Sequence, residues 1–187
     1  MRWRAKAVAI AAVTAVVTVA GCAQTVVGTA QRVNPTVPDP DRSYGYVDNR
    51  CGLLEDSTIQ EMLNAENVVR PYSGAVCQYV LERKSGQDVG AGGPSTTIDV
   101  IFSWFETGSL DRERTLAQQR GAQITELVVE RHPSFLARRD TNGAGCSATA
   151  AAGSGVLSWW VQDRDKADTD PCKDAEKLLS ATLSSEL

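Results

Sequence analysis

The sequence predicts an α+β domain, an antiparallel sheet with helices packed mainly on one side, in the element order αββαβββα. Period-two alternation of apolar residues marks the strands, most clearly over 97–105. Helix-start signals stand between and after those strands, which favours an α+β arrangement. The cysteines that follow residue 50 are even in number, which adds two expected disulfides.

The first half of the domain is expected to hold one helix and two strands. A Ser-x-x-Gln capping box opens an amphipathic stretch and predicts a helix over 56–65. Alternation predicts strands over 75–82 and 97–105, and a glycine-rich turn over 87–94 stands between them.

The second half is expected to begin with a long helix over 110–130. Asp111 and Glu113 fall in its first turn, where they favour the positive end of the helix dipole. His132-Pro133 is expected to end this helix, because the residue before a proline avoids the α region.

A hairpin and a helix are expected at the end of the chain. Three short strands are predicted over 135–139, 145–152 and 156–162. The last two form a hairpin through Gly153-Ser154-Gly155. The final helix begins with Asp170 as its N-cap and Pro171 in its first turn.

Residues 1–21 have the pattern of a secretory signal peptide. Three basic residues precede an uncharged, apolar stretch over 7–20, which is too short to span the ~30 Å of membrane hydrocarbon. The segment Val19-Ala20-Gly21-Cys22 resembles the bacterial lipobox, in which the cysteine is acylated and becomes the new N-terminus. We therefore predict Cys22 as a lipid attachment site; an uncleaved transmembrane anchor is the alternative.

Residues 22–50 are expected to form a lipidated tether, because the prolines between 35 and 40 exclude a helix. Residues 51–187 are expected to form one domain. The chain has 19 basic and 23 acidic residues, and removal of the signal leaves 16 against 23, a net charge near −7. An acidic domain excludes nucleic acid as an expected partner. We expect the protein at the extracytoplasmic face of the cell membrane, held by its lipid.

Four cysteines, Cys51, Cys77, Cys146 and Cys172, are expected to form two disulfides in an exported chain. We favour Cys51–Cys77 and Cys146–Cys172, each of which joins a helix start to a nearby strand. The pairing of Cys77 with Cys146 and of Cys51 with Cys172 is the open alternative. No metal site is expected, because the sequence has no Cys-x-x-Cys and one histidine.

Several short motifs of the domain recur together in one family. They are Cys51-Gly-Leu-Leu, Cys77-Gln-Tyr, Phe102-Ser-Trp, Gly108-Ser-Leu-Asp-Arg-Glu-Arg, the late-strand Cys146 and Pro171-Cys172-Lys-Asp-Ala. On these motifs and the lipobox, the chain resembles the mycobacterial LprB/LprC-like lipoproteins, an actinobacterial envelope family of unknown function. The resemblance implies a mycobacterial or related envelope and supplies no reaction.

No catalytic residue, metal or cofactor is predicted. His132, the one histidine, is expected at an exposed helix end, which leaves no suitable base for a catalytic triad. The acidic run over 163–170 lacks the glycine of a calcium loop and is interpreted as a solvated turn. Arg112 and Arg114 are expected on a helix surface, with binding of an acidic partner as the alternative.

Two aromatic pairs, Trp104-Phe105 and Trp159-Trp160, lie on predicted strands. Neighbouring residues of a strand point to opposite faces, so the sheet carries large aromatic side chains on both faces. Core packing is one interpretation, and a face that binds a ligand or partner is the other. If Trp159 faces the helices, Trp160 is expected to be the more exposed. A cavity lined by Trp104 or Trp160 would favour a carrier, and a flat exposed patch would favour a partner protein.

The sequence therefore predicts a membrane-anchored envelope lipoprotein that is not an enzyme and acts as an accessory or binding module. The alternative is a carrier of an apolar envelope ligand, such as a lipid or an acyl chain. The candidate ligand or partner residues are Trp104, Trp160, Arg112 and Arg114.

Overall fold

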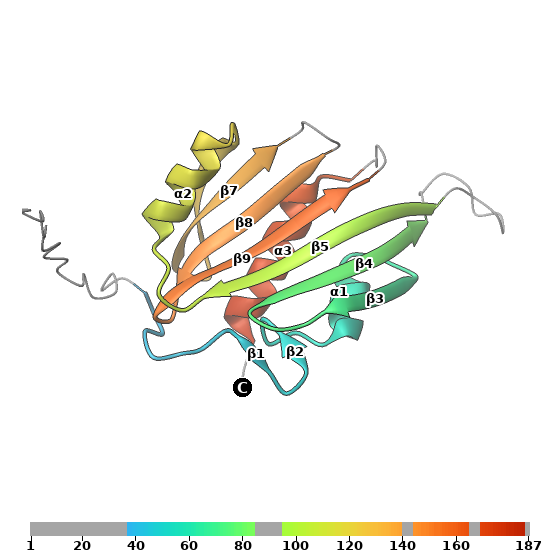
Figure 1. The fold of residues 1–187 in the computed structure, drawn as a ribbon, viewed down its shortest axis with the longest axis horizontal. Helices are drawn as coiled ribbons and strands as arrows, with labels where there is room; N and C mark the ends of the chain where they lie inside the picture. Colours follow the sequence, from blue (N-terminus) through green and yellow to red (C-terminus); the bar gives the residue numbers. More distant parts are fainter. Residues whose placement is uncertain (1–36, 85–94, 140–143, 165–168, 186–187) are drawn as a thin grey trace, which may run out of the picture. The chain divides into compact units, whose positions relative to one another are not determined.

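The computed structural model describes residues 37–84, 95–139, 144–164 and 169–185. These residues hold a seven-stranded antiparallel sheet in the order β3-β4-β5-β9-β8-β7-β6 (Figure 1). Its strands are β3 (Asn67–Tyr72), β4 (Val76–Lys84), β5 (Ser95–Phe105), β6 (Gln123–Val129), β7 (His132–Arg139), β8 (Gly145–Ala152) and β9 (Gly155–Asp163). The helices are α1 (Asp56–Met62), α2 (Leu110–Gln119) and α3 (Pro171–Ser184). The α+β class and the antiparallel sheet are confirmed.

Some predicted features lie outside the described residues. They are the signal peptide, Cys22, the first part of the tether, the glycine-rich turn over 87–94, and positions 165–168 of the acidic run.

The sheet consists of two meanders that meet at its centre. β3, β4 and β5 form one meander, and β6 to β9 form the other, each strand pairing with its neighbour in the chain. β5 then pairs with β9, from Ile98 opposite Asp163 to Phe105 opposite Val156. α2 carries the chain from the end of β5 to the edge strand β6.

The main core lies between the sheet and α3, which packs on β8 and β9 behind the sheet in Figure 1. Phe102 of β5 and Trp159 of β9 are fully buried there, with ring centroids 5.0 Å apart. The Trp159 indole N–H donates to the Thr182 hydroxyl of α3 at 2.9 Å, so its polar atom is satisfied. Small residues of β8 leave room for the leucines of α3; they are Ala148, Ala150 and Ala152.

The opposite face of the sheet is covered in part by α2, which lies near β6, β7 and β8. α1 and α3 contact each other on the α3 side, so two of the three described helices share one face. The expectation of helices mainly on one side is confirmed, and the second face is the one left with open space.

The long helix predicted over 110–130 is wrong in its second half. α2 ends at Gln119, Gly121 follows with a φ of +80°, and the chain continues as strand β6. Glu130 and Arg131 then form a two-residue turn with φ values of 47° and 67°, as a tight hairpin requires. The β-branched content of β6 outweighs the helical pattern.

His132-Pro133 therefore opens β7 instead of ending a helix. His132 is 3% exposed, not an exposed helix end as predicted. The predicted order also lacked β3, an edge strand, where Pro71 is tolerated and the register shifts between Val69 and Tyr72. The N-cap of α1 is Glu55, which makes no side-chain cap hydrogen bond, so the predicted capping box is absent from this helix.

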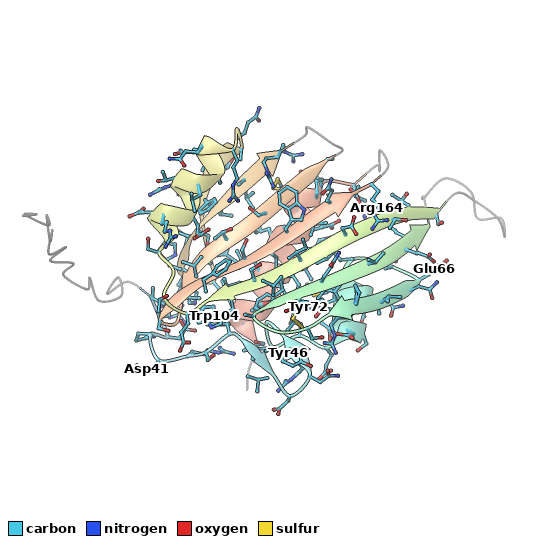
Figure 2. The ribbon with its side chains drawn as sticks, in the orientation of Figure 1. Asp41, Tyr46, Glu66, Tyr72, Trp104 and Arg164 are labelled. Carbon is cyan, nitrogen blue, oxygen red and sulfur yellow. A yellow bond between two sulfur atoms is a disulfide. The ribbon has the colours of Figure 1, made fainter. Side chains whose placement is uncertain are left out.

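The segment from Val37 to Tyr44, which we call the strap, packs on the body, so the folded part begins well before Cys51. Tyr44 is fully buried, and its ring centroid lies 5.7 Å from that of Trp104; Figure 2 labels Trp104 and, on the strap, Asp41. Burial and the Asp39 carboxylate, to which its hydroxyl donates, raise the pKa of Tyr44 above its ordinary value. The Gly153 amide of the β8–β9 turn donates to Asp39 at 3.4 Å.

Both favoured disulfides are present. Cys51–Cys77 joins β2 (Arg50–Cys51, which pairs with β1, Tyr46–Val47) to β4. Cys146–Cys172 joins β8 to the first turn of α3. The same turn is capped by Asp170, which accepts from the Cys172 amide at 3.1 Å. Burial works to raise the pKa of Asp170, but hydrogen bonds from Arg138 and from Cys172 outweigh it and lower that pKa.

We expect the double substitution Cys146→Ser with Cys172→Ser to lower the free energy of unfolding by about 3–4 kcal/mol, from the loss of loop-closure restraint over a separation of 26 residues. Denaturant melts measure the loss, with the reduced wild-type protein as a reference. An unchanged midpoint, or alkylation of native wild-type cysteines after residue 50, would contradict the assignment.

Candidate functional site

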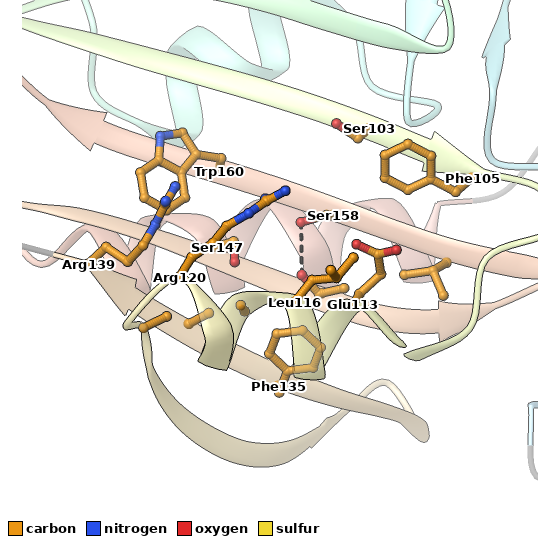
Figure 3. A pocket seen from close by; sticks show the side chains of 15 residues that line it. Ser103, Phe105, Glu113, Leu116, Arg120, Phe135, Arg139, Ser147, Ser158 and Trp160 are labelled. Atoms are coloured by element: carbon orange, nitrogen blue, oxygen red, sulfur yellow. Dashed lines mark hydrogen bonds between the residues drawn. The ribbon is translucent and has the colours of Figure 1, made fainter. Parts of the chain in front are cut away.

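A cavity of about 250 Å³ lies between α2 and the sheet face that α3 leaves uncovered (Figure 3). We call it the α2 groove. β5, β9, β8 and β7 form its floor, and α2 with the following turn forms its wall. The sheet residues that define it are Ser103, Phe105, Phe135, Ala137, Arg139, Ser147, Thr149, Val156, Ser158 and Trp160. The residues from α2 and its turn are Glu113, Leu116, Ala117, Arg120 and Ala122.

A row of hydroxyl groups crosses the middle of the floor because of the strand register. Ser103 on β5 is opposite Ser158 on β9, which in turn is opposite Thr149 on β8. The Thr149 and Ser158 hydroxyl oxygens lie 2.8 Å apart, a hydrogen-bond distance. Ser103 and Ser158 are partly exposed and can offer polar atoms to a bound molecule, whereas Thr149 is 3% exposed and holds Ser158 in place.

Trp160 stands at one end of the groove with Arg139. The central carbon of the Arg139 guanidinium lies 4.8 Å from the centroid of the Trp160 ring, a cation–π contact. Gly145 on β8 makes room for the indole, because a Cβ built there would lie 2.5 Å from Trp160 Cζ2. A side chain at position 145 would therefore displace the ring from the floor.

Arg120 is the second guanidinium of this end. It is the C-cap residue of α2, and Figure 3 shows it on the same side of the groove as Arg139 and Trp160. Among the described residues, neither Arg120 nor Arg139 forms an ion pair with a carboxylate. This end of the groove is therefore positively charged.

The other end of the groove carries aromatic and aliphatic side chains together with the Glu113 carboxylate. Phe105 of β5 is opposite Val156 of β9, and Figure 3 shows Phe105 on the side away from Trp160. Leu116 of α2 and the buried ring of Phe135 on β7 also line the cavity. The groove thus changes along the strands from two cations to a set of hydrocarbon side chains beside one carboxylate.

The wall helix α2 is less buried than α3. The groove-facing residues of α2 recur at helical spacing, from Glu113 to Arg120, yet no residue of α2 is buried. Its N-cap, Ser109, accepts from the Arg112 amide at 3.3 Å. Arg114 joins the helix to β6 through an ion pair with Glu126 at 2.8 Å.

The four candidate ligand or partner residues are placed differently. Trp160 is half-buried in the groove, whereas Trp159 is fully buried, so the predicted difference in exposure is confirmed. Trp104 is 8% exposed and belongs to the core beside Tyr44, outside the groove. Arg112 is exposed on α2 and does not line the cavity.

Arg120, Arg139 and the hydroxyl row were missed by sequence reasoning. Strand register brings the hydroxyls together, strand order brings β7 with Arg139 beside them, and the packing of α2 over the sheet adds Arg120. Gly145 carried a usable signal, since a glycine inside a strand indicates a close approach.

The acidic run is not a solvated turn at its described ends. Asp163 is 1% exposed, and burial raises its pKa; Asp170 caps α3. The described residues contain no cluster of histidine, cysteine or acidic side chains suited to a metal ion. Nor do they include a helix with the length and hydrophobicity needed to cross a bilayer.

Residues 17–185 match the family described as "Protein of unknown function (DUF3558)", and the chain belongs to this family. It is similar to the proteins named "Putative lipoprotein LprB" from Mycobacterium tuberculosis and Mycobacterium bovis, at 22% identity over 170 residues, 88% of this chain and 86% of each relative. The protein of the same name from Mycobacterium leprae is 23% identical over 173 residues, 88% of this chain and 85% of the relative. No solved structure matches the chain. The resemblance to LprB-type lipoproteins is confirmed.

The two neighbouring tryptophans are expected to differ in their effect on stability. Trp159→Ala should cost on the order of 3–5 kcal/mol, because it leaves a cavity in the core under α3. Trp160→Ala should stay within about 1 kcal/mol of wild type, because its ring lies at the edge of the groove. Denaturant melts of both variants measure this, and equal, large losses would show that both rings are core.

Proposed function

We propose that the chain is a membrane-anchored envelope lipoprotein that acts as a non-catalytic binding module, with the α2 groove as its binding site. The observation that carries this proposal is the half-buried Trp160 in a cavity on the sheet face opposite the core. A cavity lined by Trp160 is the feature expected of a protein that carries a ligand, so it favours a bound ligand over a docked partner protein.

The anchor is supported by the N-terminal sequence and by the relatives. The basic start, the apolar stretch and the lipobox-like end at Cys22 fit a lipoprotein signal. The mycobacterial relatives are themselves named lipoproteins. We infer that the lipid on Cys22 holds the body at the extracytoplasmic face of the membrane.

The absence of catalysis is supported by the surroundings of the groove hydroxyls. A serine nucleophile is activated by an adjacent base, most often a histidine. His132 is the one histidine of the sequence, and its ring Nδ1 lies 2.9 Å from the Ala151 carbonyl oxygen, while Nε2 faces the Asp39 carboxylate at 3.7 Å. It does not line the groove, so Ser158 and Thr149 have no imidazole beside them.

A carrier of a wholly apolar ligand is supported less well. The groove combines aromatic and aliphatic side chains with hydroxyls, Glu113 and two arginines. Its volume of about 250 Å³ is below the roughly 300–1,000 Å³ of typical ligand pockets. A small or partly inserted ligand with polar atoms suits this lining better than a diacyl lipid held by its tails.

We expect Cys22→Ala to release the protein from membranes or to leave it uncleaved, with the disulfide-bonded body unchanged, because the thiol that accepts the lipid is gone. Membrane fractionation and intact-mass measurement distinguish the wild type from the variant. Unmodified, soluble Cys22 in the mature wild-type protein would overturn the anchor.

The binding module is tested by native mass spectrometry of the lipidated protein taken from its own membrane. We expect a non-covalent species on the wild type that is lost from Trp160→Ala and kept by Arg112→Gln, a surface change on α2 outside the groove. A wild type that carries nothing, or a species equally retained by Trp160→Ala, would contradict the groove as the binding site.

A further inference from the structure

We propose that the α2 groove binds a single-chain amphiphile with an anionic headgroup, which Arg120 and Arg139 hold at the Trp160 end. This inference rests on the proposed function and specifies the ligand of the same site. It is carried by the distribution of charge, hydroxyls and hydrocarbon along the groove.

The anionic headgroup is inferred from two arginines without carboxylate partners. The mature chain is acidic, with 16 basic and 23 acidic residues, and many of its described arginines pair with carboxylates. Those are Arg50, Arg70, Arg83, Arg114, Arg138 and Arg164. Arg120 and Arg139 differ, since both line a cavity and neither has such a partner in the described part of the chain.

Arg139 is also held in position before any ligand binds. Its guanidinium lies on the Trp160 ring, and Gly145 allows that ring to lie against β8. A planar guanidinium that is already oriented loses less rotamer freedom when it binds a phosphate or carboxylate, and it can donate two hydrogen bonds in parallel. Trp160 therefore serves as the platform for the anion-binding arginine.

The hydroxyl row lies next along the groove and suits the oxygen atoms that link a headgroup to a chain. Ser147 is opposite Trp160, and two residues further along the strands Thr149 is opposite Ser158. Hydroxyls can donate to ester or ether oxygens there. The proposed ligand therefore gives the polar centre of the groove floor a binding partner.

The chain of the amphiphile is inferred to lie over Phe105 and Leu116, the apolar lining residues that keep exposed surface, with the buried Val156 and Phe135 beneath them. Trp160 and Val156 are four residues apart on β9, so the two ends of the groove are separated by about 13 Å. The cavity of about 250 Å³ accommodates one chain segment better than two. Glu113 lies on this side of the groove in Figure 3, and its carboxylate opposes a headgroup bound in the reverse direction.

If Cys22 carries the lipid, the strap tethers the body to the membrane, which is a nearby store of amphiphiles. The strap contacts the β8–β9 turn through Asp39 and the Gly153 amide, and a Cβ built at Gly155, the first residue of β9, would meet the Phe105 carbonyl oxygen at 2.0 Å. The strap therefore joins the body at the Phe105 end of the groove. Cys22 is 15 residues before Val37 in the sequence, at most about 50 Å of extended chain.

The test is a binding titration of the full lipidated protein in phosphatidylcholine nanodiscs, with empty nanodiscs as the blank. The probes are octyl phosphate, octyltrimethylammonium with the same chain, and inorganic phosphate without a chain. Trp160 fluorescence reports binding, and Trp160→Phe identifies its share of the signal. We expect saturable binding of octyl phosphate and no saturable binding of the other two probes.

The double variant Arg120→Gln with Arg139→Gln should weaken octyl phosphate binding by on the order of tenfold or more, because charge-assisted hydrogen bonds are removed. The matched control, Arg112→Gln with Arg131→Gln, removes two exposed charges outside the groove and should bind as the wild type does. Melting curves of both variants should coincide with that of the wild type, since all four side chains are at least partly exposed.

Each opposing outcome overturns a different part of the inference. Equal binding of octyltrimethylammonium overturns the anionic headgroup, and equal binding of inorganic phosphate overturns the chain. Unchanged binding in the arginine double variant overturns the assignment of the two arginines, and failure of all three probes overturns the inference as a whole. If the protein from its own membrane nevertheless carries a neutral or protein ligand that Trp160→Ala loses, the proposed function stands and only this inference falls.

Discussion

The pairing of β5 with β9 is the contact on which the rest of the structure depends. It joins the two meanders and sets both faces of the sheet at once, because Phe102 beside Trp159 builds the core while Ser103 beside Ser158 builds the groove floor. A slip of one residue would exchange the two sets between the faces. The register that buries the hydrophobic side chains is therefore the same register that assembles the candidate site.

Neither disulfide crosses this pairing. Cys51–Cys77 lies within the first half of the chain, and Cys146–Cys172 lies within the second. Each covalent link fastens a helix start or a short strand pair to the nearest long strand. The two halves themselves are held together by backbone hydrogen bonds and by the shared core under α3.

Much of the fold could be predicted, because its strongest signals are local. The alternation of β5, the cap of α3 and the difference between Trp159 and Trp160 follow from periods and caps. The prediction of helix in the second half of 110–130 was wrong, because the turn at Glu130-Arg131 has left-handed backbone without a glycine to mark it. The site was largely hidden, since Arg120, Arg139 and Ser158 are distant in sequence and meet only through strand order and the packing of α2 over the sheet.

The low burial of α2 has a consequence for how this family can diversify. No residue of α2 is buried, so substitutions along it spare the core and, like most surface changes, should each cost about 0.5 kcal/mol or less. The body, with its disulfides and its central strand pair, can remain constant while the residues of α2 that line the groove are substituted. Members of the family could then keep the same architecture while one ten-residue helix changes the shape and charge of the groove wall.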